Sequence, residues 1–236
     1  MTIELTWLGH GSWEIQLESH HVLLDPFLDD SPTSPVKADQ VQADYILVSH
    51  GHFDHVADVV AIAQRTGATV VSNYEICEWL GKQGVAKCEP MNLGGGCDFP
   101  FGRVQLTLAH HSSTLPDGTP GGNPGGFVIA LGSHNIYFAC DTGLFYDMKL
   151  IGSGEYNGRQ GIDLAVLPIG DRFTMGPVDS IRAIQLIEPH KVLPSHYGTW
   201  PPIAQDAEKW AQSVRLRTEA EPFVLAPGEK LEMGDE

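Results

Sequence analysis

A cluster of histidines and an aspartate directly after an apolar run constrains this chain more than any other feature. Residues 45–48 read Y-I-L-V, which is typical of a strand buried on both faces. Residues 49–55 then read S-H-G-H-F-D-H. An H-x-H-x-D-H match would arise by chance in a chain of this composition with a probability of roughly 0.002. The alternative interpretation, a polar turn with solvated histidines, is therefore disfavoured.

The spacing of these side chains suits metal binding. In an extended segment His50 and His52 lie on the same side of the backbone, so they can share one ion. Asp54 and His55 come where the chain turns into a helix, and they can bind a second ion. Imidazole and carboxylate groups are ligands of Zn²⁺, and of Mn²⁺ or Fe where carboxylate is present.

Four side chains cannot fill the coordination shells of two ions, and further candidates follow three later predicted strands. His110 or His111 follows the strand expected at 103–109, Asp141 the strand at 136–139 and His196 the strand at 192–194. Ligands at several strand ends are expected when the loops along one edge of a sheet build a site. For Asp141 and His196 the alternative is a polar group that only caps a strand end.

The remaining pattern predicts a mixed α/β chain. Alternating apolar residues on both sides of a glycine-containing turn at residues 9–11 predict a hairpin. Further strands are expected at 21–24, 69–71, 127–131 and 164–168. Helices are expected at 56–65, 177–187 and 204–213, and one more helix should begin at a capping box formed by Ser72 and Glu75 and end near residue 84. No shift in composition marks a boundary, so we expect one domain over residues 1–236.

Composition narrows the possible partners. The chain has 14 Lys and Arg against 30 Asp and Glu, and its formal net charge is −16. Such a charge repels phosphate backbones and anionic membrane surfaces, so we expect neither a nucleic-acid nor a membrane partner. The 4 cysteines show no C-x-x-C spacing, and the sequence suggests neither a signal peptide nor a membrane span. We expect a soluble cytoplasmic protein with reduced thiols.

The H-x-H-x-D-H motif with later His, Asp and His residues resembles the metallo-β-lactamase superfamily, and the resemblance covers nearly the whole chain. Shorter stretches resemble a family of small metal-dependent hydrolases that is similar to the ascorbate phosphate lactonases. They are residues 9–12 (GHGS), 25–28 (DPFL), 109–113 (AHHSS), 143–145 (GLF), 173–177 (FTMGP) and 196–201 (HYGTWP). The resemblance implies an αββα sandwich of four layers.

The resemblance also implies which residues bind each of two metal ions. His50, His52 and His111 would bind the first ion, Asp54, His55 and His196 the second, and Asp141 both. His111 is preferred because the family pattern has a variable residue before its His-Ser-Ser. The expected cofactors are two divalent ions, with zinc favoured over manganese or iron.

Two ions about 3.5–4 Å apart hold a water, lower its pKa toward ~7 and polarise the substrate. The expected reaction is attack by metal-bound hydroxide on an ester, lactone or phosphoester bond of a small molecule. This substrate can be anionic, because the positive charge of the two ions attracts it despite the acidic chain. Asp54 is expected to act as ligand and general base. His10 is expected to donate to the substrate oxyanion, and its alternative is an exposed turn residue.

Other interpretations stay open at this point. A nuclease or phosphodiesterase of the same fold is disfavoured by the few basic residues, and a non-enzymatic metal-dependent sensor or binding subunit would keep the same ligands. Homo-oligomerisation is a further expectation. Asp25 either ends a strand or orients a ligand histidine. The glycines of residues 118–126 form either a mobile lid or a hairpin connection. Arg172 is the one basic residue proposed to contact a phosphate group of the substrate.

Overall fold

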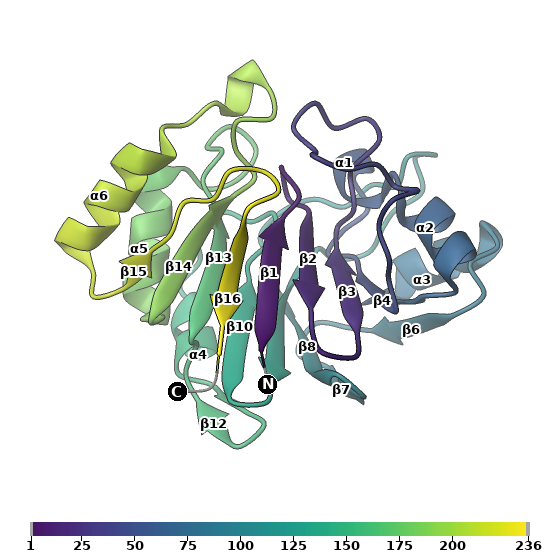
Figure 1. Cartoon of the computed structure of the whole chain (residues 1–236), viewed down its shortest axis with the longest axis horizontal. Helices are drawn as coiled ribbons and strands as arrows, with labels where there is room; N and C mark the ends of the chain where they lie inside the picture. Colours follow the sequence, from purple (N-terminus) through teal and green to yellow (C-terminus); the bar gives the residue numbers. More distant parts are fainter. Residues whose placement is uncertain (1, 235–236) are drawn as a thin grey trace. The chain divides into compact units, whose positions relative to one another are not determined.

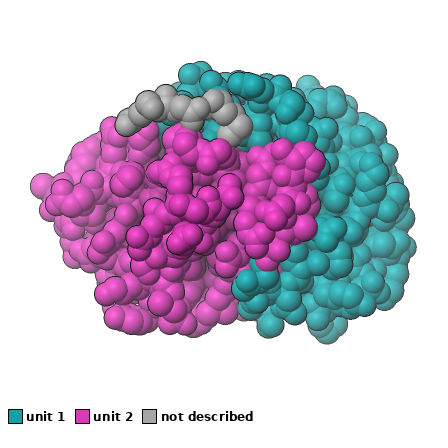
Figure 2. All heavy atoms as spheres, turned by 90° about the horizontal axis from the view of Figure 1, so that it is seen from below, with its two compact units in different colours: residues 1–95, 112–125, 225–236 teal, residues 96–111, 126–224 magenta. Residues whose placement is uncertain are grey.

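The computed structural model describes residues 2–234, and the chain divides into two compact units (Figure 2). Unit 1 comprises Met1–Gly95, Ser112–Gly125 and Leu225–Glu236, and unit 2 comprises Gly96–His111 and Gly126–Val224. Each unit contains a seven-stranded sheet and helices, which confirms the expected mixed α/β class. The expectation of a single domain stays a prediction.

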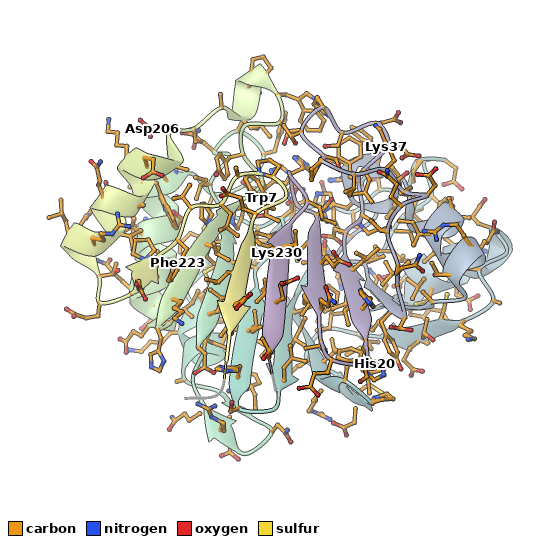
Figure 3. All side chains as sticks on the ribbon, viewed as in Figure 1. Trp7, His20, Lys37, Asp206, Phe223 and Lys230 are labelled. Atoms are coloured by element: carbon orange, nitrogen blue, oxygen red, sulfur yellow. The ribbon has the colours of Figure 1, made fainter. Side chains whose placement is uncertain are left out.

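The sheet of unit 1 combines the first and last strands of the chain with a parallel half. Its order is β16 (Lys230–Met233), β1 (Ile3–Trp7), β2 (Trp13–Gln16), β3 (His21–Leu24), β4 (Tyr45–Leu47), β5 (Thr69–Asn73) and β6 (Cys88–Met91). The expected hairpin pairs Trp7 with Trp13, and β3 to β6 run parallel. β16 lies beside β1 (Figure 1) and carries Lys230, which is labelled in Figure 3. The Nζ of Lys230 is 2.6 Å from Oε1 of Glu4 in β1.

Helices cover the parallel half of this sheet. They are α1 (Phe53–Val56), α2 (Val59–Thr66) and α3 (Tyr74–Lys82). Ile62 of α2 and Ile76 of α3 belong to one buried cluster with Ile46 and Val70 of the strands, so the apolar sides of both helices face the sheet. Ile46 and Leu47 of β4 are thereby buried, as the continuous apolar run of residues 45–48 predicted.

Two details of these helices differ from the predictions. The helix expected over 56–65 is divided, because Asp58 precedes α2 as its N-terminal capping position. The capping box at Ser72 is wrong. Asn73 caps α3 by accepting the N–H of Ile76 at 2.9 Å, whereas Ser72 still belongs to β5 and donates to the carbonyl of Val48 at 2.7 Å.

The sheet of unit 2 is parallel on one side. Its order is β15 (Glu221–Pro222), β14 (Lys191–Ser195), β13 (Leu164–Pro168), β10 (His134–Phe138), β9 (Gly125–Leu131), β8 (Gly102–Leu108) and β7 (Gly96–Phe99). β10, β13 and β14 run parallel, so their carboxyl ends lie along one edge of this sheet. A separate small hairpin joins β11 (Glu155–Tyr156) and β12 (Arg159–Gln160).

The helices of unit 2 pack on its sheet (Figure 1). They are α4 (Met148–Gly152), α5 (Pro177–Ile187), α6 (Ala207–Arg217) and the short 3₁₀ helix η1 (Pro201–Ile203). Ile184 of α5 and Trp210 of α6 share a buried cluster with Ala165 and Val192 of the strands. The helix expected over 204–213 begins later, because Asp206 (Figure 3) caps it by accepting the N–H of Lys209 at 3.0 Å. No helix within residues 2–234 is both long and apolar enough to cross a membrane.

Candidate metal centre

In unit 1 the parallel strands β3 and β4 end side by side, and Asp25 connects their ends. The N–H of Asp25 donates to the carbonyl of Leu47 at 2.9 Å, and its side chain is 1% exposed. Its Oδ1 accepts the N–H of Ser49 at 2.7 Å and its Oδ2 accepts the Ser49 hydroxyl at 2.5 Å. The carboxylate of Asp25 therefore holds the start of the segment that contains the metal motif.

The same carboxylate holds the end of that segment. The Nδ1 of His55 lies 2.9 Å from Oδ2 of Asp25, and both side chains are buried. Because a carboxylate only accepts, Nδ1 of His55 carries the hydrogen and Nε2 keeps the lone pair that a metal needs. Gly11 leaves room for this ring, since a Cβ there would lie 2.9 Å from Cε1 of His55. This geometry favours the orienting role of Asp25 over a simple strand end.

His50 and His52 direct ring nitrogens at the same point. Nδ1 of His50 lies 2.9 Å from the Ser49 hydroxyl oxygen, and Nε2 of His50 lies 3.0 Å from Nδ1 of His52. Since the hydroxyl of Ser49 donates to Asp25, its oxygen accepts the Nδ1–H of His50 and leaves Nε2 as the ligand atom. Two nitrogens this close can both bind one Zn²⁺ at about 2.0–2.1 Å.

Asp54 lies beside two buried histidines. Its Oδ2 is 3.0 Å from Nε2 of His10 and 3.9 Å from Nε2 of His55. These three residues offer ligand atoms that all lie within 4.8 Å of one another. His10 is 0% exposed, which excludes the interpretation as an exposed turn residue. Its ring also meets Phe27 edge-on, with centroids 5.7 Å apart.

The glycine-rich residues that follow Ser112 form a hairpin connection. Thr114 and Pro120 form a β-bridge, and the N–H of Leu115 donates to the carbonyl of Thr119 at 2.9 Å. Leu115 is 2% exposed and belongs to the core of unit 1. Asn73 donates from its side chain to the carbonyls of Gly121 at 2.7 Å and Asn123 at 3.0 Å. These contacts favour the hairpin over the mobile lid.

In unit 2, Asp141 contacts two candidate histidines. It follows β10, and its Oδ2 lies 3.0 Å from Nε2 of His196 and 3.5 Å from Nε2 of His111. Asp141 is 3% exposed and His196 is 2% exposed, so both are buried. Imidazole nitrogens around a carboxylate oxygen are again a donor set that suits Zn²⁺.

The neighbouring histidine, His110, has a different environment. Its ring stacks on Phe145 with centroids 5.0 Å apart and an interplanar angle of 28°. The backbone N–H of His110 donates to the Thr142 hydroxyl at 2.9 Å, and the backbone carbonyl of His110 accepts the N–H of Gly143 at 3.0 Å. This arrangement supports His111 as the ligand of the adjacent pair, and the assignment stays a prediction.

The loop after β13 packs against the same part of unit 2. A Cβ at Gly170 would collide with the carbonyl oxygen of His196, and the N–H of Met175 donates to the carbonyl of Thr142 at 2.8 Å. At the exposed tip of this loop the guanidinium of Arg172 lies 5.8 Å from the centroid of the Phe173 ring. Next to His196, burial raises the pKa of Tyr197 to about 12, so its phenol is neutral at pH 7.

Several candidate residues have left-handed backbone. Non-glycine residues with positive φ include His10 (52°), Asp25 (45°), Cys140 (53°), Asp171 (72°) and His196 (53°). Such conformations are unfavourable for L-residues and persist where surrounding contacts enforce them. His10 and His196 are candidates, Asp25 orients one and Cys140 precedes Asp141, whereas Asn157 and Glu188 have positive φ away from the candidate residues.

Sequence reasoning missed the serines that support these side chains. Ser49 links His50 to Asp25, as described above. Ser12 donates from its hydroxyl to the carbonyl of Asp25 at 2.7 Å and accepts the N–H of Phe27 at 3.0 Å. A single serine has no diagnostic spacing, and only the resemblance of residues 9–12 marked Ser12.

Comparison with known proteins gives the family. A model of the β-lactamase superfamily domain matches residues 20–197. A UPF0173 metal-dependent hydrolase of Thermus thermophilus is 46% identical over 231 residues, which cover 98% of this chain and 99% of the relative. One from Heliobacterium modesticaldum is 44% identical over 232 residues and covers 97% of each.

Solved structures agree with this assignment. Igni18, a metallo hydrolase from the archaeon Ignicoccus hospitalis, is 31% identical with a TM-score of 0.89 over 100% of both chains. The metallo-β-lactamase fold protein YhfI from Bacillus subtilis, at 13% identity, has a TM-score of 0.75 over 99% of this chain and 100% of that protein, which shows a shared fold. The chain therefore has the metallo-β-lactamase fold and belongs to the metal-dependent hydrolases of that superfamily.

Proposed function

We propose that this metal-dependent hydrolase uses two divalent ions and cleaves an ester, lactone or phosphoester bond in a small molecule. The proposed ligands are His50, His52 and His111 for the first ion, Asp54, His55 and His196 for the second, and Asp141 for both. One observation supports the proposal most directly: Nε2 of His50 and Nδ1 of His52 lie 3.0 Å apart. Two imidazoles that present different ring nitrogens to one point are arranged for a common ion.

The chemistry of these donors favours zinc. Imidazoles outnumber carboxylates among the proposed ligands and no thiolate is included, a set that Zn²⁺ accepts and that also permits Mn²⁺ or Fe. The net charge of −16 opposes a long nucleic acid as substrate. A small substrate, including an anionic one, is consistent with this charge because bound divalent ions would make the site locally positive.

When bound, two divalent ions supply an activated water and polarise the bond that breaks. The side chains of this chain would then handle the proton. Asp54 is the carboxylate that accepts it, since its side chain is 13% exposed while the His10 beside it is fully buried. His10, whose Nε2–H donates to Oδ2 of Asp54 at 3.0 Å, would orient that carboxylate, and Asp54 would return the proton to the oxygen of the departing group.

A metal analysis followed by a substrate panel tests this function. The purified protein should contain a transition metal, or gain thermal stability when Zn²⁺ or Mn²⁺ is added. With the metal defined, it should hydrolyse members of a panel of lactones, carboxylic esters and phosphodiesters. His52→Ala should lower kcat/KM at least about 100-fold, because it removes a proposed ligand.

His20→Ala is the matched control, because His20 lies in a turn and contacts the hydroxyl of Ser19 at 2.9 Å. It should keep the wild-type kcat/KM. A protein that contains no transition metal and is not stabilised by Zn²⁺ or Mn²⁺ would contradict the metal site. Equal activity of His52→Ala and wild type would contradict the assigned ligands.

A further inference from the structure

The hydroxyl of Ser113 lies between two backbone groups of unit 1. It accepts the N–H of Gly51 at 3.0 Å and donates to the carbonyl of Gly121 at 3.0 Å. The N–H of Gly121 returns a hydrogen bond to the carbonyl of Ser113 at 3.0 Å. With both bonds made, the direction of the hydroxyl is fixed. Gly51 lies between His50 and His52, so Ser113 holds the backbone from which both histidines project.

The hairpin around Ser113 also packs directly on Gly51. A Cβ at Gly51 would lie 3.1 Å from Cγ and Cδ2 of Leu115, which is itself 2% exposed. At the end of the hairpin, the N–H of Gly125 donates to the carbonyl of Ser49 at 3.0 Å. The hairpin therefore contacts the backbone before and between the two histidines.

Ser112 acts on the ring of the second histidine. Its hydroxyl oxygen lies 3.3 Å from Nε2 of His52, while Nδ1 of His52 faces His50. When this hydroxyl accepts a hydrogen from Nε2, the lone pair of His52 is on Nδ1. In His50 the hydrogen is on Nδ1, toward Ser49, and the ligand atom is Nε2. The two rings thus need opposite tautomers, and different serines support each one.

We propose that Ser113 is a positioning residue for the metal site, and that the hairpin of residues 112–125 presents His50 and His52 as a preset pair of ligands. This role rests on the proposed function, because it concerns the same two histidines. It adds that their geometry depends on a hydroxyl that binds no metal itself. Removal of a group that supports a metal ligand in this way typically lowers metal affinity about 10–100-fold.

The far end of the hairpin offers a matched control. Nε1 of Trp79 donates to Oδ2 of Asp117 at 2.7 Å, a contact that joins the hairpin to α3 without touching His50, Gly51 or His52. Trp79→Phe removes this hydrogen bond and loosens the same hairpin. A purely structural role of Ser113 would therefore be reproduced by Trp79→Phe.

The experiment compares wild type, Ser113→Ala, Ser113→Thr and Trp79→Phe. Zn²⁺ affinity is measured by competition with a chromophoric chelator, Co²⁺ coordination by its absorption spectrum, and the stability of the metal-free proteins by thermal unfolding. Ser113→Ala should bind Zn²⁺ about 10–100-fold more weakly and alter the Co²⁺ spectrum. Ser113→Thr, which keeps the hydroxyl, should restore the affinity, and Trp79→Phe should change it less than about threefold.

The possible failures are distinguishable. Wild type that binds Zn²⁺ together with Ser113→Ala of equal affinity overturns the positioning role and leaves the proposed function intact. The same role is overturned if Trp79→Phe loses as much affinity as Ser113→Ala. Wild type that binds neither Zn²⁺ nor Co²⁺ overturns the proposed function, and the positioning role with it.

Discussion

The carboxylate of Asp25 and the imidazole of His55 form a buried contact, with Oδ2 2.9 Å from Nδ1 and both side chains 1% exposed. Asp25→Asn would place an amide, which both donates and accepts, where His55 requires an acceptor. We expect Zn²⁺ affinity to fall about 10–100-fold, because Nε2 of His55 is no longer oriented as a ligand. Chelator competition measures this loss. Asp39→Asn, at an exposed position, should bind Zn²⁺ like wild type, and equal affinity of Asp25→Asn would refute the orienting role.

The adjacent pair His110 and His111 allows a direct test of the ligand assignment. Nε2 of His111 lies 3.5 Å from Asp141, whereas the ring of His110 stacks on Phe145. His111→Ala should therefore reduce the metal content and lower kcat/KM at least about 100-fold. His110→Ala should keep its metal, and lost stacking should reduce stability by roughly 0.5–1.5 kcal/mol. Metal analysis of both variants decides, and loss of metal in His110→Ala alone would reverse the assignment.

Two thiols of unit 1 should differ in reactivity. The hydrogen bond with Cys88 and, to a smaller extent, burial raise the pKa of Cys77. The same hydrogen bond lowers the pKa of Cys88. Because the thiolate is the nucleophile, iodoacetamide should modify Cys88 first, and Cys77 should stay protected in the folded protein. Peptide mass spectrometry over time measures both rates. Cys77→Ala should slow the modification of Cys88 near pH 7, and equal rates for the two thiols in wild type would contradict this prediction.

Asp58 should make stability depend on pH in an unusual direction. Its Oδ2 accepts the N–H groups of Leu28 at 2.6 Å and Asp29 at 3.2 Å, yet burial raises the pKa of its carboxyl above 3.8. The folded state then retains this proton at pH values where the unfolded state has released it. The stabilisation is complete below the unfolded pKa and is lost as pH rises through the folded pKa.

Comparison with Asp58→Asn isolates this contribution, since the amide oxygen still accepts and does not titrate. As pH rises above about 3.8, the free energy of unfolding of wild type should fall relative to that of Asp58→Asn. Urea unfolding at a series of pH values measures the difference. A difference that does not change with pH, or that changes in favour of wild type, would contradict the assigned shift.

The candidate ligands could be found from sequence because their signal is local. His50, His52, Asp54 and His55 lie within one strand-to-helix junction, and Asp141 and His196 each follow a strongly apolar strand. Asp25 could also be proposed from sequence as an orienting group, but the supporting serines could not be found in this way. Ser113 reaches Gly51 across 62 positions of the chain, and only the folded hairpin brings them together.

The missed strands show a second limit. β6, β7, β15 and β16 lie at the edges of their sheets and contain 4, 4, 2 and 4 residues. Segments this short show too little alternation to be recognised, and β6 even contains Pro90. β16 becomes a strand because the edge of β1 is available to pair with it, which is a tertiary effect.

The pairing of β16 with β1 also has a consequence for synthesis of the chain. Ile3 pairs with Met233, so one edge of the unit 1 sheet lacks its partner strand until residues 230–233 have been synthesised. Unit 2 is complete in sequence at Val224, before residues 225–236 are made. Unit 1 therefore begins before unit 2 and is completed after it, and during translation β1 presents an unpaired strand edge that can associate with other chains.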